Sequence, residues 1–301
     1  MKKLLDKLSV PVIQGGMGIG ISMGGLAGAV AAEGGMGVIS TANIGFREPD
    51  FRENPLVANI RALRQEIRKA REIAGGRGLI AVNAMVATTE FAVMVREAVR
   101  AGIDAVISGA GLPLTLPEAA GEGALLAPVV SGDRAAALLL KHWERKFQCR
   151  PDFVVVEGSK AGGHLGFRKE ELLDGTVRSL RDTVKSVKQK VGEIPVFAAG
   201  GVFSREDIDE ICRAGAAGAQ IATRFIATDE CDASQGYKDV ILAAGEEDAV
   251  IIDSPVGMPG RALRTPLIEK IRKQGRIPPR SCMNCIVTCD PGTTKYCISR
   301  A

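Results

Sequence analysis

The amino-acid sequence predicts an α/β fold, a (β/α)8 TIM-type barrel with a small inserted segment and a cysteine-rich C-terminal tail. Eight short apolar runs rich in β-branched residues alternate with helical stretches along the 301 residues. The composition agrees, because 46% of the residues are hydrophobic but only 4% are aromatic. An interior built from Val, Ile, Leu and Ala suits parallel strands buried under helices.

The strands are expected at residues 10–14, 37–40, 79–83, 105–108, 125–130, 153–157, 194–199 and 219–223. The helices are expected at residues 25–33, 54–73, 90–101, 133–147, 172–191 and 205–214. A doubly wound open sheet competes with the barrel, because residues 15–20 superficially resemble a dinucleotide-binding turn. The spacing argues against it, since Ile21 or Met23 stands where GxGxxG needs its third glycine.

The pattern becomes irregular from Phe225 to Asp253, and a last helix is expected at residues 266–274. Residues 275–279 then interrupt any helix, because adjacent prolines remove backbone donors and force extended backbone. The sequence thus divides into a barrel (1–225), an inserted segment with a closing helix (226–275) and a tail (276–301).

Charge and hydropathy limit the classes of partner. The net charge of +4 comes from 39 basic and 35 acidic residues that form no single block, so no nucleic-acid partner is expected. No stretch approaches the ~20 apolar residues of a membrane span, so we expect a cytoplasmic protein without a membrane partner.

Two glycine-containing turns predict a phosphate site. Residues 198–204 end the seventh strand with Gly200 and Gly201, and residues 218–225 form the edge of the eighth. In barrels of this class phosphate commonly binds at the loops after strands seven and eight, where backbone N–H groups face the anion. A lone glycine pair would indicate only a tight turn, but two such turns on consecutive strands favour phosphate.

His164 is the candidate catalytic residue. It lies in a glycine-rich loop, residues 157–166, that follows the sixth strand, at the face where catalytic groups collect in barrels. An imidazole there could take a proton or hydrogen-bond a substrate anion. The other histidine, His142, lies in a strongly charged helix and is interpreted as a solvated or packing residue.

Six segments together resemble a known family. Residues 11–17, 82–83, 108–111, 157–164, 198–201 and 220–225 are similar to the nitronate monooxygenases, formerly called 2-nitropropane dioxygenases. They are also similar to the flavin-type enoyl-ACP reductases, which share these motifs. The sequence departs from the family at Ala222, where glycine is usual, at Leu112, where asparagine is common, and at Lys160, where glutamate is frequent.

The resemblance implies that FMN lies over the strand ends, with the isoalloxazine ring on residues 15–17 and Asn83 beside it. It implies phosphate contacts from both glycine-containing turns and a catalytic role for His164. The residues expected to bind the cofactor are Gly15, Gly16, Met17, Asn83, Gly109, Glu157, Gly162, Gly163, Gly200, Gly201, Gly218, Gln220, Ile221 and Thr223.

The tail carries a possible metal motif that is not part of the ordinary family pattern. Its cysteines, Cys282, Cys285, Cys289 and Cys297, are spaced CxxCxxxCxxxxxxxC. Four thiolates can hold a zinc ion or a [4Fe-4S] cluster. Zinc ribbons tend to use two CxxC pairs and this tail has one, so with a redox flavin in the chain we favour the cluster and keep zinc as the alternative.

Three functions are consistent with these features. The first is oxidation of nitronates or nitroalkanes by FMN and oxygen. The second is reduction of an enoyl thioester or similar activated alkene, with an iron–sulfur cluster feeding FMN. The third is a non-catalytic electron carrier or redox sensor. A small-molecule substrate is expected, with an electron-donor protein or NAD(P)H as reductant, and a homodimer is one assembly to test.

Overall fold

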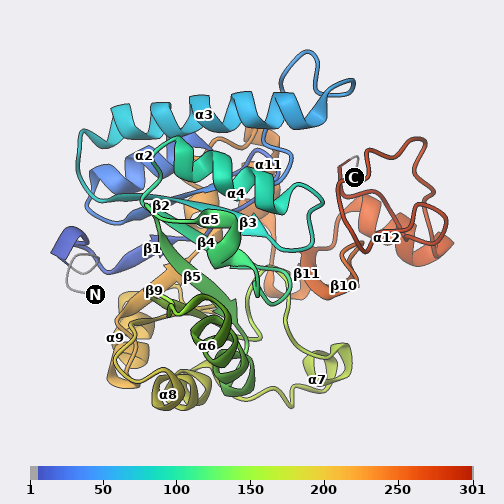
Figure 1. Ribbon diagram of the computed structural model, residues 1–301. Coiled ribbons are helices and arrows are strands. Elements are labelled where there is room, and N and C mark those ends of the chain that lie inside the picture. The colour runs from blue at the N-terminus through green and yellow to red at the C-terminus, as the bar shows by residue number, and fades with distance from the viewer. Residues whose placement is uncertain (1–5, 300–301) are drawn as a thin grey trace.

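The computed structural model describes residues 6–299 and contains a closed barrel of eight parallel strands, which confirms the predicted fold class (Figure 1). Around the barrel the strands follow the order β1-β2-β3-β4-β5-β6-β8-β9. They are β1 (Val12–Gln14), β2 (Met36–Ser40), β3 (Leu79–Met85), β4 (Ala105–Gly109), β5 (Leu125–Val130), β6 (Val154–Glu157), β8 (Val196–Ala199) and β9 (Gly218–Ile221).

Helices connect the barrel strands and pack around them. Those between barrel strands are α2 (Gly24–Ala32), α3 (Pro55–Ala74), α4 (Phe91–Arg100), α5 (Leu116–Ala120), α6 (Asp133–Phe147), α7 (Lys169–Asp174), α8 (Leu180–Val191) and α9 (Arg205–Arg213). After β9 follow α10 (Thr223–Ile226), α11 (Gln235–Ala243), the 3-10 helix η1 (Glu246–Asp248) and α12 (Pro266–Gln274).

The barrel interior is filled by side chains. The rings of Phe153 and Phe197 meet edge to face with centroids 5.6 Å apart, and both are fully buried. Aliphatic side chains of the other strands, such as Ile13, Met36 and Leu79, complete this cluster. A second, larger apolar cluster lies between the strands and the helices. Because one apolar cluster covers the inner face of the strands and the other covers their outer face, the strands appear in the sequence as continuous apolar runs.

The amino end of α2 is capped by a residue from the far end of the chain. This helix has no acidic residue in its first turn and no side-chain cap of its own. The carboxylate of Asp232 accepts N–H hydrogen bonds from Met23 (2.9 Å), Leu26 (3.1 Å) and Gly25 (3.2 Å). A carboxylate is favourable there because the first N–H groups of a helix lack partners within the helix. The segment after β9 is thereby fixed against the start of the barrel.

The helix expected at residues 172–191 is wrong as a single element. The structure has two helices, α7 and α8, and Gly175 ends the first with a left-handed φ of +67°. Glycine adopts this conformation at low cost and is a common helix terminator. The second helix begins at Ser179, whose hydroxyl accepts from the Asp182 N–H.

A second, three-stranded sheet was not among the elements expected from the sequence. It consists of β7 (Gly163–His164), β10 (Ala249–Asp253) and β11 (Pro259–Leu263), in the order β10-β11-β7 with antiparallel pairing. The region before Asp253, expected to be irregular, therefore includes a strand as well as α11. The β-branched run Val250-Ile251-Ile252 was its available signal.

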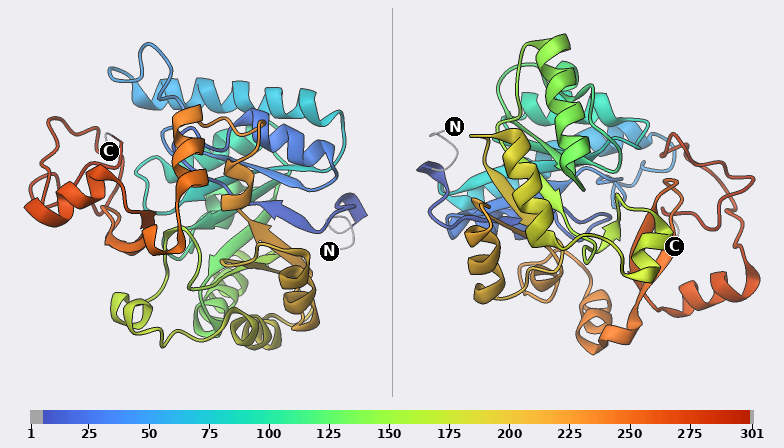
Figure 2. Two further views of the ribbon diagram at one scale, coloured as in Figure 1. Left: turned by 180° about the vertical axis from the view of Figure 1, so that it is seen from behind. Right: turned by 90° about the horizontal axis from the view of Figure 1, so that it is seen from below.

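The cysteine-bearing tail packs on the loop that follows β3, at the carboxyl end of the barrel. The Val287 N–H donates to the Ala87 carbonyl (2.9 Å) and the Thr89 N–H to the Cys285 carbonyl (3.2 Å). Figure 2 shows the C-terminal segment and the start of the chain on opposite sides of the molecule in both views. None of the helices in residues 6–299 is both long and apolar enough to cross a membrane.

Candidate active site

The structure brings the loop after β1 between the ends of β3 and β9. A Cβ atom added to Gly16 would lie 2.3 Å from the Asn83 Cβ, so the backbone at Gly16 touches that side chain directly. A Cβ added to Gly15 would lie 3.4 Å from the Gln220 Cγ. Asn83, expected beside the flavin ring, and Gln220, expected to contact its phosphate, therefore both lie next to the loop after β1 at the carboxyl-terminal edge of the barrel, where catalytic groups of this fold gather.

The turn after β8 has the geometry of an anion site. Gly200 and Gly201 have φ values of +92° and +86°, which a residue with a side chain rarely adopts. The N–H groups of Gly200, Gly201 and Val202 donate to no group within residues 6–299. Lys160 packs against Gly201, with its Cβ 3.0 Å from where a Gly201 Cβ would be, and brings an ammonium group close to the turn.

The helix after this turn does not supply further free donors. Ser204 caps α9 by accepting from the Asp207 N–H (3.2 Å), and the Asp207 carboxylate accepts from the N–H groups of Phe203 and Ser204 (2.8 Å each). These bonds hold the pKa of Asp207 below its usual value. The amino end of α9 thus already carries an anion, and the glycine amides are the donors left for a phosphate.

Gln220 has a polar atom that requires a ligand or water. Its Oε1 is buried and has no hydrogen-bond partner among the described residues. Leaving such an acceptor unpaired costs about 1–3 kcal/mol. A flavin mononucleotide carries ring N–H and ribityl O–H donors as well as the phosphate that the glycine turn suits. The residues present therefore fit this cofactor.

Glu157 ends β6 at the edge of the same site. Burial raises the pKa of its carboxyl group to about 7, and the hydrogen bond from the Gly166 N–H (2.9 Å) opposes that shift only in part. Ser131 holds the other side of Gly166 by donating to its carbonyl (2.7 Å). A carboxyl group that titrates near neutrality suits the transfer of a proton in either direction.

His164 lies in β7, and β11 fixes its backbone. The imidazole Nε2 is 2.8 Å from the hydroxyl oxygen of Ser254, and burial lowers the His164 pKa. Ser254 was missed by the sequence analysis, because it follows a strand that had not been recognised. Nothing in the sequence alone places it beside His164.

The remaining predicted residues divide into three groups. Gly109 ends β4 against Val129, and the carbonyl of Ile221 accepts from the Gly15 N–H (2.8 Å), so both lie at the carboxyl-terminal edge with Met17 and Thr223. Gly162 and Gly163 precede His164 and have open space around them. Gly218 is not brought to this edge, because it begins β9 and packs on the Pro11 carbonyl at the opposite end.

All four tail cysteines line one cavity next to the loop after β3. The Asn284 N–H donates to the Cys282 Sγ at 3.3 Å, a contact that suits a sulfur carrying negative charge. Within residues 6–299, however, no three Cys, His, Asp or Glu side chains already stand at metal-binding spacing. The metal-ligand role of Cys282, Cys285, Cys289 and Cys297 stays a prediction.

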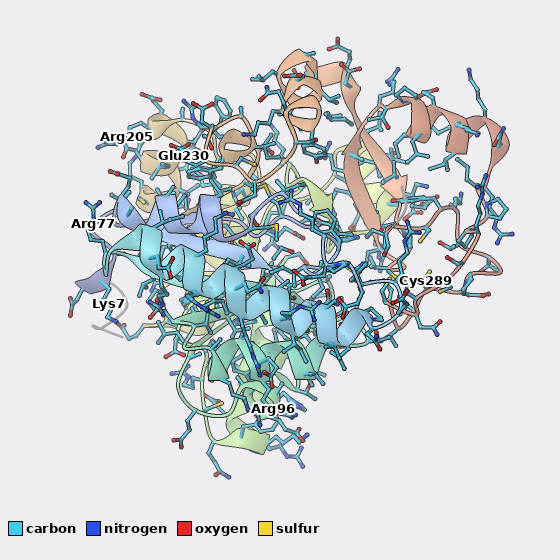
Figure 3. The ribbon with its side chains drawn as sticks, turned by 90° about the horizontal axis from the view of Figure 1, so that it is seen from above. Lys7, Arg77, Arg96, Arg205, Glu230 and Cys289 are labelled. Carbon is cyan, nitrogen blue, oxygen red and sulfur yellow. The ribbon has the colours of Figure 1, made fainter. Side chains whose placement is uncertain are left out.

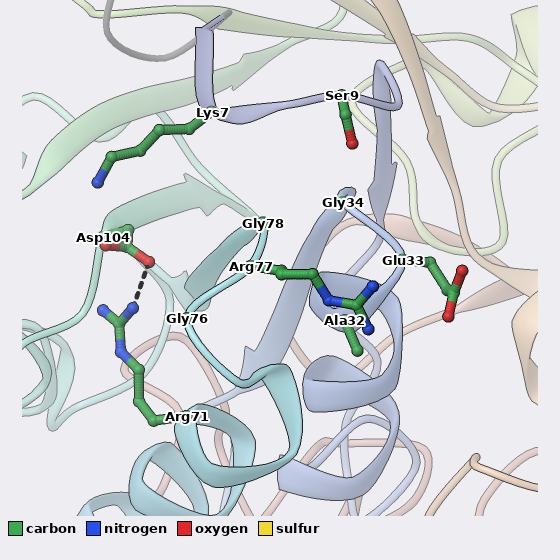
Figure 4. A pocket seen from close by; sticks show the side chains of 10 residues that line it. All are labelled: Lys7, Ser9, Ala32, Glu33, Gly34, Arg71, Gly76, Arg77, Gly78 and Asp104. Carbon is green, nitrogen blue, oxygen red and sulfur yellow. Dashed lines mark ion pairs between the residues drawn. The ribbon is translucent and has the colours of Figure 1, made fainter.

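A larger cavity, of about 380 Å³, lies at the opposite end of the barrel and contains none of the predicted site residues (Figure 4). Segments that precede strands line it, and Arg71 is ion-paired with Asp104 across 2.8 Å. Figure 3 shows two of its lining residues, Lys7 and Arg77, on the far side of the molecule from Cys289. Residues at this end of a barrel ordinarily serve stability.

Comparisons with known proteins find similar sequences and a similar fold. A family model described as nitronate monooxygenase matches residues 1–288. A (3aS,4S,5R,7aS)-5-hydroxy-7a-methyl-1-oxo-octahydro-1H-indene-4-carboxyl-CoA dehydrogenase from Mycobacterium tuberculosis is 30% identical over 266 residues, which are 88% of this chain and 66% of that protein. A probable nitronate monooxygenase from Staphylococcus saprophyticus is 36% identical over 124 residues, 40% of this chain and 34% of that protein.

Among solved structures, FabK from Thermotoga maritima has a TM-score of 0.72 at 27% identity, covering 91% of this chain and 76% of that chain. The chain spans 66% of the length of the curated dehydrogenase that it matches. The family model ends before Cys289 and Cys297, so the second half of the cysteine motif lies outside it.

Proposed function

Because the chain belongs to the nitronate monooxygenase family of FMN-dependent oxidoreductases, we propose that it interconverts a saturated acyl thioester and its α,β-unsaturated counterpart. The observation that carries this proposal is Glu157, a carboxyl group with a pKa raised to about 7 beside the loop that bears His164. A reaction at a carbon next to a carbonyl needs a group that moves a proton near neutral pH. Glu157 has that property.

The expected cofactor site combines the features described above. The amides of Gly200, Gly201 and Val202 would hold the phosphate, with Lys160 as a nearby cation. Gly15, Gly16, Asn83 and Gln220 would contact the ring system. When bound, FMN supplies an acceptor or donor of an electron pair.

The proposed reaction requires one proton transfer by a side chain of the protein. Dehydrogenation of an acyl thioester would remove the Cβ hydrogen together with its electron pair, for which a bound FMN would be the acceptor. The Cα hydrogen leaves as a proton, for which the ionised Glu157 is the acceptor. In the reverse direction the protonated carboxyl group returns that proton to Cα, so atoms and electrons balance in both directions.

The relatives support the thioester more than other substrates. The relative from Mycobacterium tuberculosis that covers 88% of this chain is named as a carboxyl-CoA dehydrogenase. The relative named as a probable nitronate monooxygenase matches 40% of the chain.

Oxidation of nitronates with oxygen is the second candidate function. A nitronate has already lost its α-proton, so it needs a hydrogen-bond donor for its anionic oxygens and no base. His164 is able to provide such a donor without Glu157. The two functions therefore differ in whether they require the carboxyl group.

The experiment uses the flavin-loaded protein under anaerobic conditions. Reduced flavin is mixed with a short trans-2-enoyl-CoA, oxidised flavin with the saturated acyl-CoA, and oxidised flavin with ethyl nitronate followed by oxygen. Flavin absorbance reports each reaction. Exchange with the thioesters that is lost in Glu157→Gln but retained in Arg77→Ala, at the opposite end of the barrel, supports the proposal.

Reaction with ethyl nitronate alone, unchanged in Glu157→Gln, would replace the thioester by the second candidate. Reaction with neither substrate, together with electron exchange with a redox partner protein, would indicate the non-catalytic carrier. In all three cases the flavin itself is the readout, so cofactor loss cannot be mistaken for a change of substrate.

We also propose that the tail holds a [4Fe-4S] cluster, with zinc as the alternative. A cluster would pass single electrons between a donor protein and a bound flavin, whereas NAD(P)H would give its hydride to the flavin directly. The four cysteines line one cavity, and a backbone N–H already contacts the Cys282 sulfur. Iron, sulfide and zinc analysis of anaerobically prepared protein tests this, with Cys285→Ser and with Cys212→Ser, on the exposed side of α9, as the control. One equivalent of zinc without iron or sulfide would contradict the cluster.

A further inference from the structure

The side chain of Ser254 meets the His164 ring because the small antiparallel sheet aligns them. β7 pairs with β11 so that His164 stands opposite Gly260, and β10 pairs with β11 so that Asp253 stands opposite Pro259. Residues 254–258 form the turn between β10 and β11, closed by the Ser254 N–H donating to the Met258 carbonyl (3.1 Å). The Ser254 hydroxyl at the start of this turn lies 2.8 Å from the His164 Nε2.

Hydrogen-bond capacity decides the direction of that bond. A serine hydroxyl has one hydrogen to donate and two lone pairs that accept. The Val256 N–H, which can only donate, points to the Ser254 oxygen at 3.4 Å. The Tyr296 phenol also approaches that oxygen, and because burial raises the pKa of the phenol it keeps a hydrogen of its own to donate there. With both lone pairs of the serine oxygen facing donors, the acceptor left for the hydroxyl hydrogen among residues 6–299 is His164 Nε2, at 2.8 Å. The hydroxyl hydrogen therefore goes to Nε2, which requires a neutral ring with its proton on Nδ1.

The other ring nitrogen is available to a ligand. Nδ1 of His164 makes no hydrogen bond with any described residue, and it is not among the side-chain atoms that are sealed from solvent without a partner. Burial disfavours the charged imidazolium, which agrees with a neutral ring. A neutral ring whose Nε2 is already occupied has one function left at Nδ1, the donation of its hydrogen.

We infer that Ser254 is a positioning residue that fixes His164 in the Nδ1–H form, so that His164 donates a hydrogen bond to a negatively charged oxygen of the substrate and does not act as a base. This inference deepens the proposed function. It rests on that function only where it identifies the oxygen as the enolate oxygen of a thioester. The proton transfer at carbon then belongs to Glu157 alone. Donors aimed at an oxygen that gains charge are among the largest contributions to catalysis.

The cysteine-bearing tail braces the turn that carries Ser254. The Thr288 hydroxyl donates to the Val256 carbonyl at 3.0 Å, and the Lys295 ammonium pairs with Asp253 at 3.1 Å. The phenol of Tyr296 also approaches the Ser254 hydroxyl. Three residues of the tail thus hold the end of β10 and its turn, so the tail supports the geometry of His164.

The chain has only two histidines, which makes the ring state of His164 directly measurable. The flavin-loaded protein is labelled with 15N at the imidazoles, and long-range 1H–15N spectra are recorded well above the ordinary imidazole pKa of about 6.5. His142, on α6, is the internal reference, and His142→Gln completes the assignment. We expect the His164 spectrum to show a protonated Nδ1 and an unprotonated Nε2.

The variants separate a positioning role from a general effect on folding. Ser254→Ala should shift His164 toward a mixture of tautomers while the His142 signals stay unchanged, and Ser254→Thr should restore the original pattern. Thr288→Val should shift it in the same direction as Ser254→Ala. Ser186→Ala, which removes a hydroxyl from the outer helix α8, is the matched control and should change nothing.

The kinetic consequence should be a fall in kcat of about tenfold or more in Ser254→Ala, with little change in KM, because the oriented donor acts on the charge that develops in the transition state. A wild-type His164 protonated on Nε2, or an unchanged His164 spectrum in Ser254→Ala, would overturn the inference. The spectra need no substrate, so this outcome is independent of whether the thioester assignment holds.

Discussion

The replacement Gly201→Asp tests the cofactor site most directly. Gly201 has a φ of +86° and an N–H group that donates to no other described residue, and a Cβ there would lie 3.0 Å from the Lys160 Cβ. The new side chain acts in two ways. It favours a backbone conformation that turns the N–H away from the anion, and it places a carboxylate beside the phosphate.

The magnitude follows from these two effects. A hydrogen bond between an amide and a charged group contributes about 1.5–3 kcal/mol. Two unit charges at a separation of ~4 Å near a protein surface repel by about 1–4 kcal/mol, depending on how much solvent screens them. We take the lower end of both ranges because Gly201 is exposed. The resulting loss of about 2.5 kcal/mol corresponds to roughly a sixtyfold rise in the Kd for FMN.

The assay is a fluorescence titration of FMN into apoprotein, with circular dichroism as the check on folding. Gly192→Asp is the matched control, because Gly192 also has a positive φ, +63°, and has nothing within 4 Å of an added Cβ at the end of α8. An aspartate there also stands at a positive φ, but far from the expected flavin contacts. Wild-type affinity in folded Gly201→Asp would refute the placement of the phosphate.

Three further predictions concern catalysis and stability. His164→Ala should retain flavin and lose turnover about a hundredfold or more, as measured by stopped-flow flavin reduction, and normal turnover on a true substrate would exclude a catalytic role. Glu157→Gln should remove a pH dependence of folding stability. Because the pKa of Glu157 is raised to about 7 in the folded protein, the wild type loses stability as the pH rises from about 4.5 to about 7, and thermal melts of the variant should lack that loss. Asp232→Ala should cost about 2–4 kcal/mol in urea unfolding, because three N–H groups of α2 lose their acceptor, and a cost below ~0.5 kcal/mol would contradict the capping role.

The barrel was predictable because each of its strands is buried on both faces. Such strands appear as short apolar runs between helices, and the run at residues 125–130 matches β5 at both ends. The break between α7 and α8 was less visible, because Gly175 is one residue in a long stretch of helix-forming composition. Only its φ of +67° distinguishes a terminator from a tolerated glycine.

The candidate site was predictable where backbone conformation imposes a residue type. Gly16 and Gly201 are needed for close approach or a positive φ, and this requirement is visible in the sequence as glycine. Contacts between distant segments leave no such local sign. The unpartnered Gln220 oxygen and the capping of α9 by Asp207 depend on how the chain closes around them. The first leaves an acceptor for a ligand donor, and the second removes the amino end of α9 from the donors free for an anion.

The position of Ser254 shows why the tail and the catalytic loop have to be considered together. A serine after a short strand has many ordinary roles, and only the register of two strand pairs brings it to His164. The same turn is held from the other side by Thr288 of the tail. A metal bound by the tail cysteines would stiffen the support of this turn without touching the substrate. If the cysteines hold a metal, its removal by a chelator should alter the tautomer of His164, which the 1H–15N spectra would report.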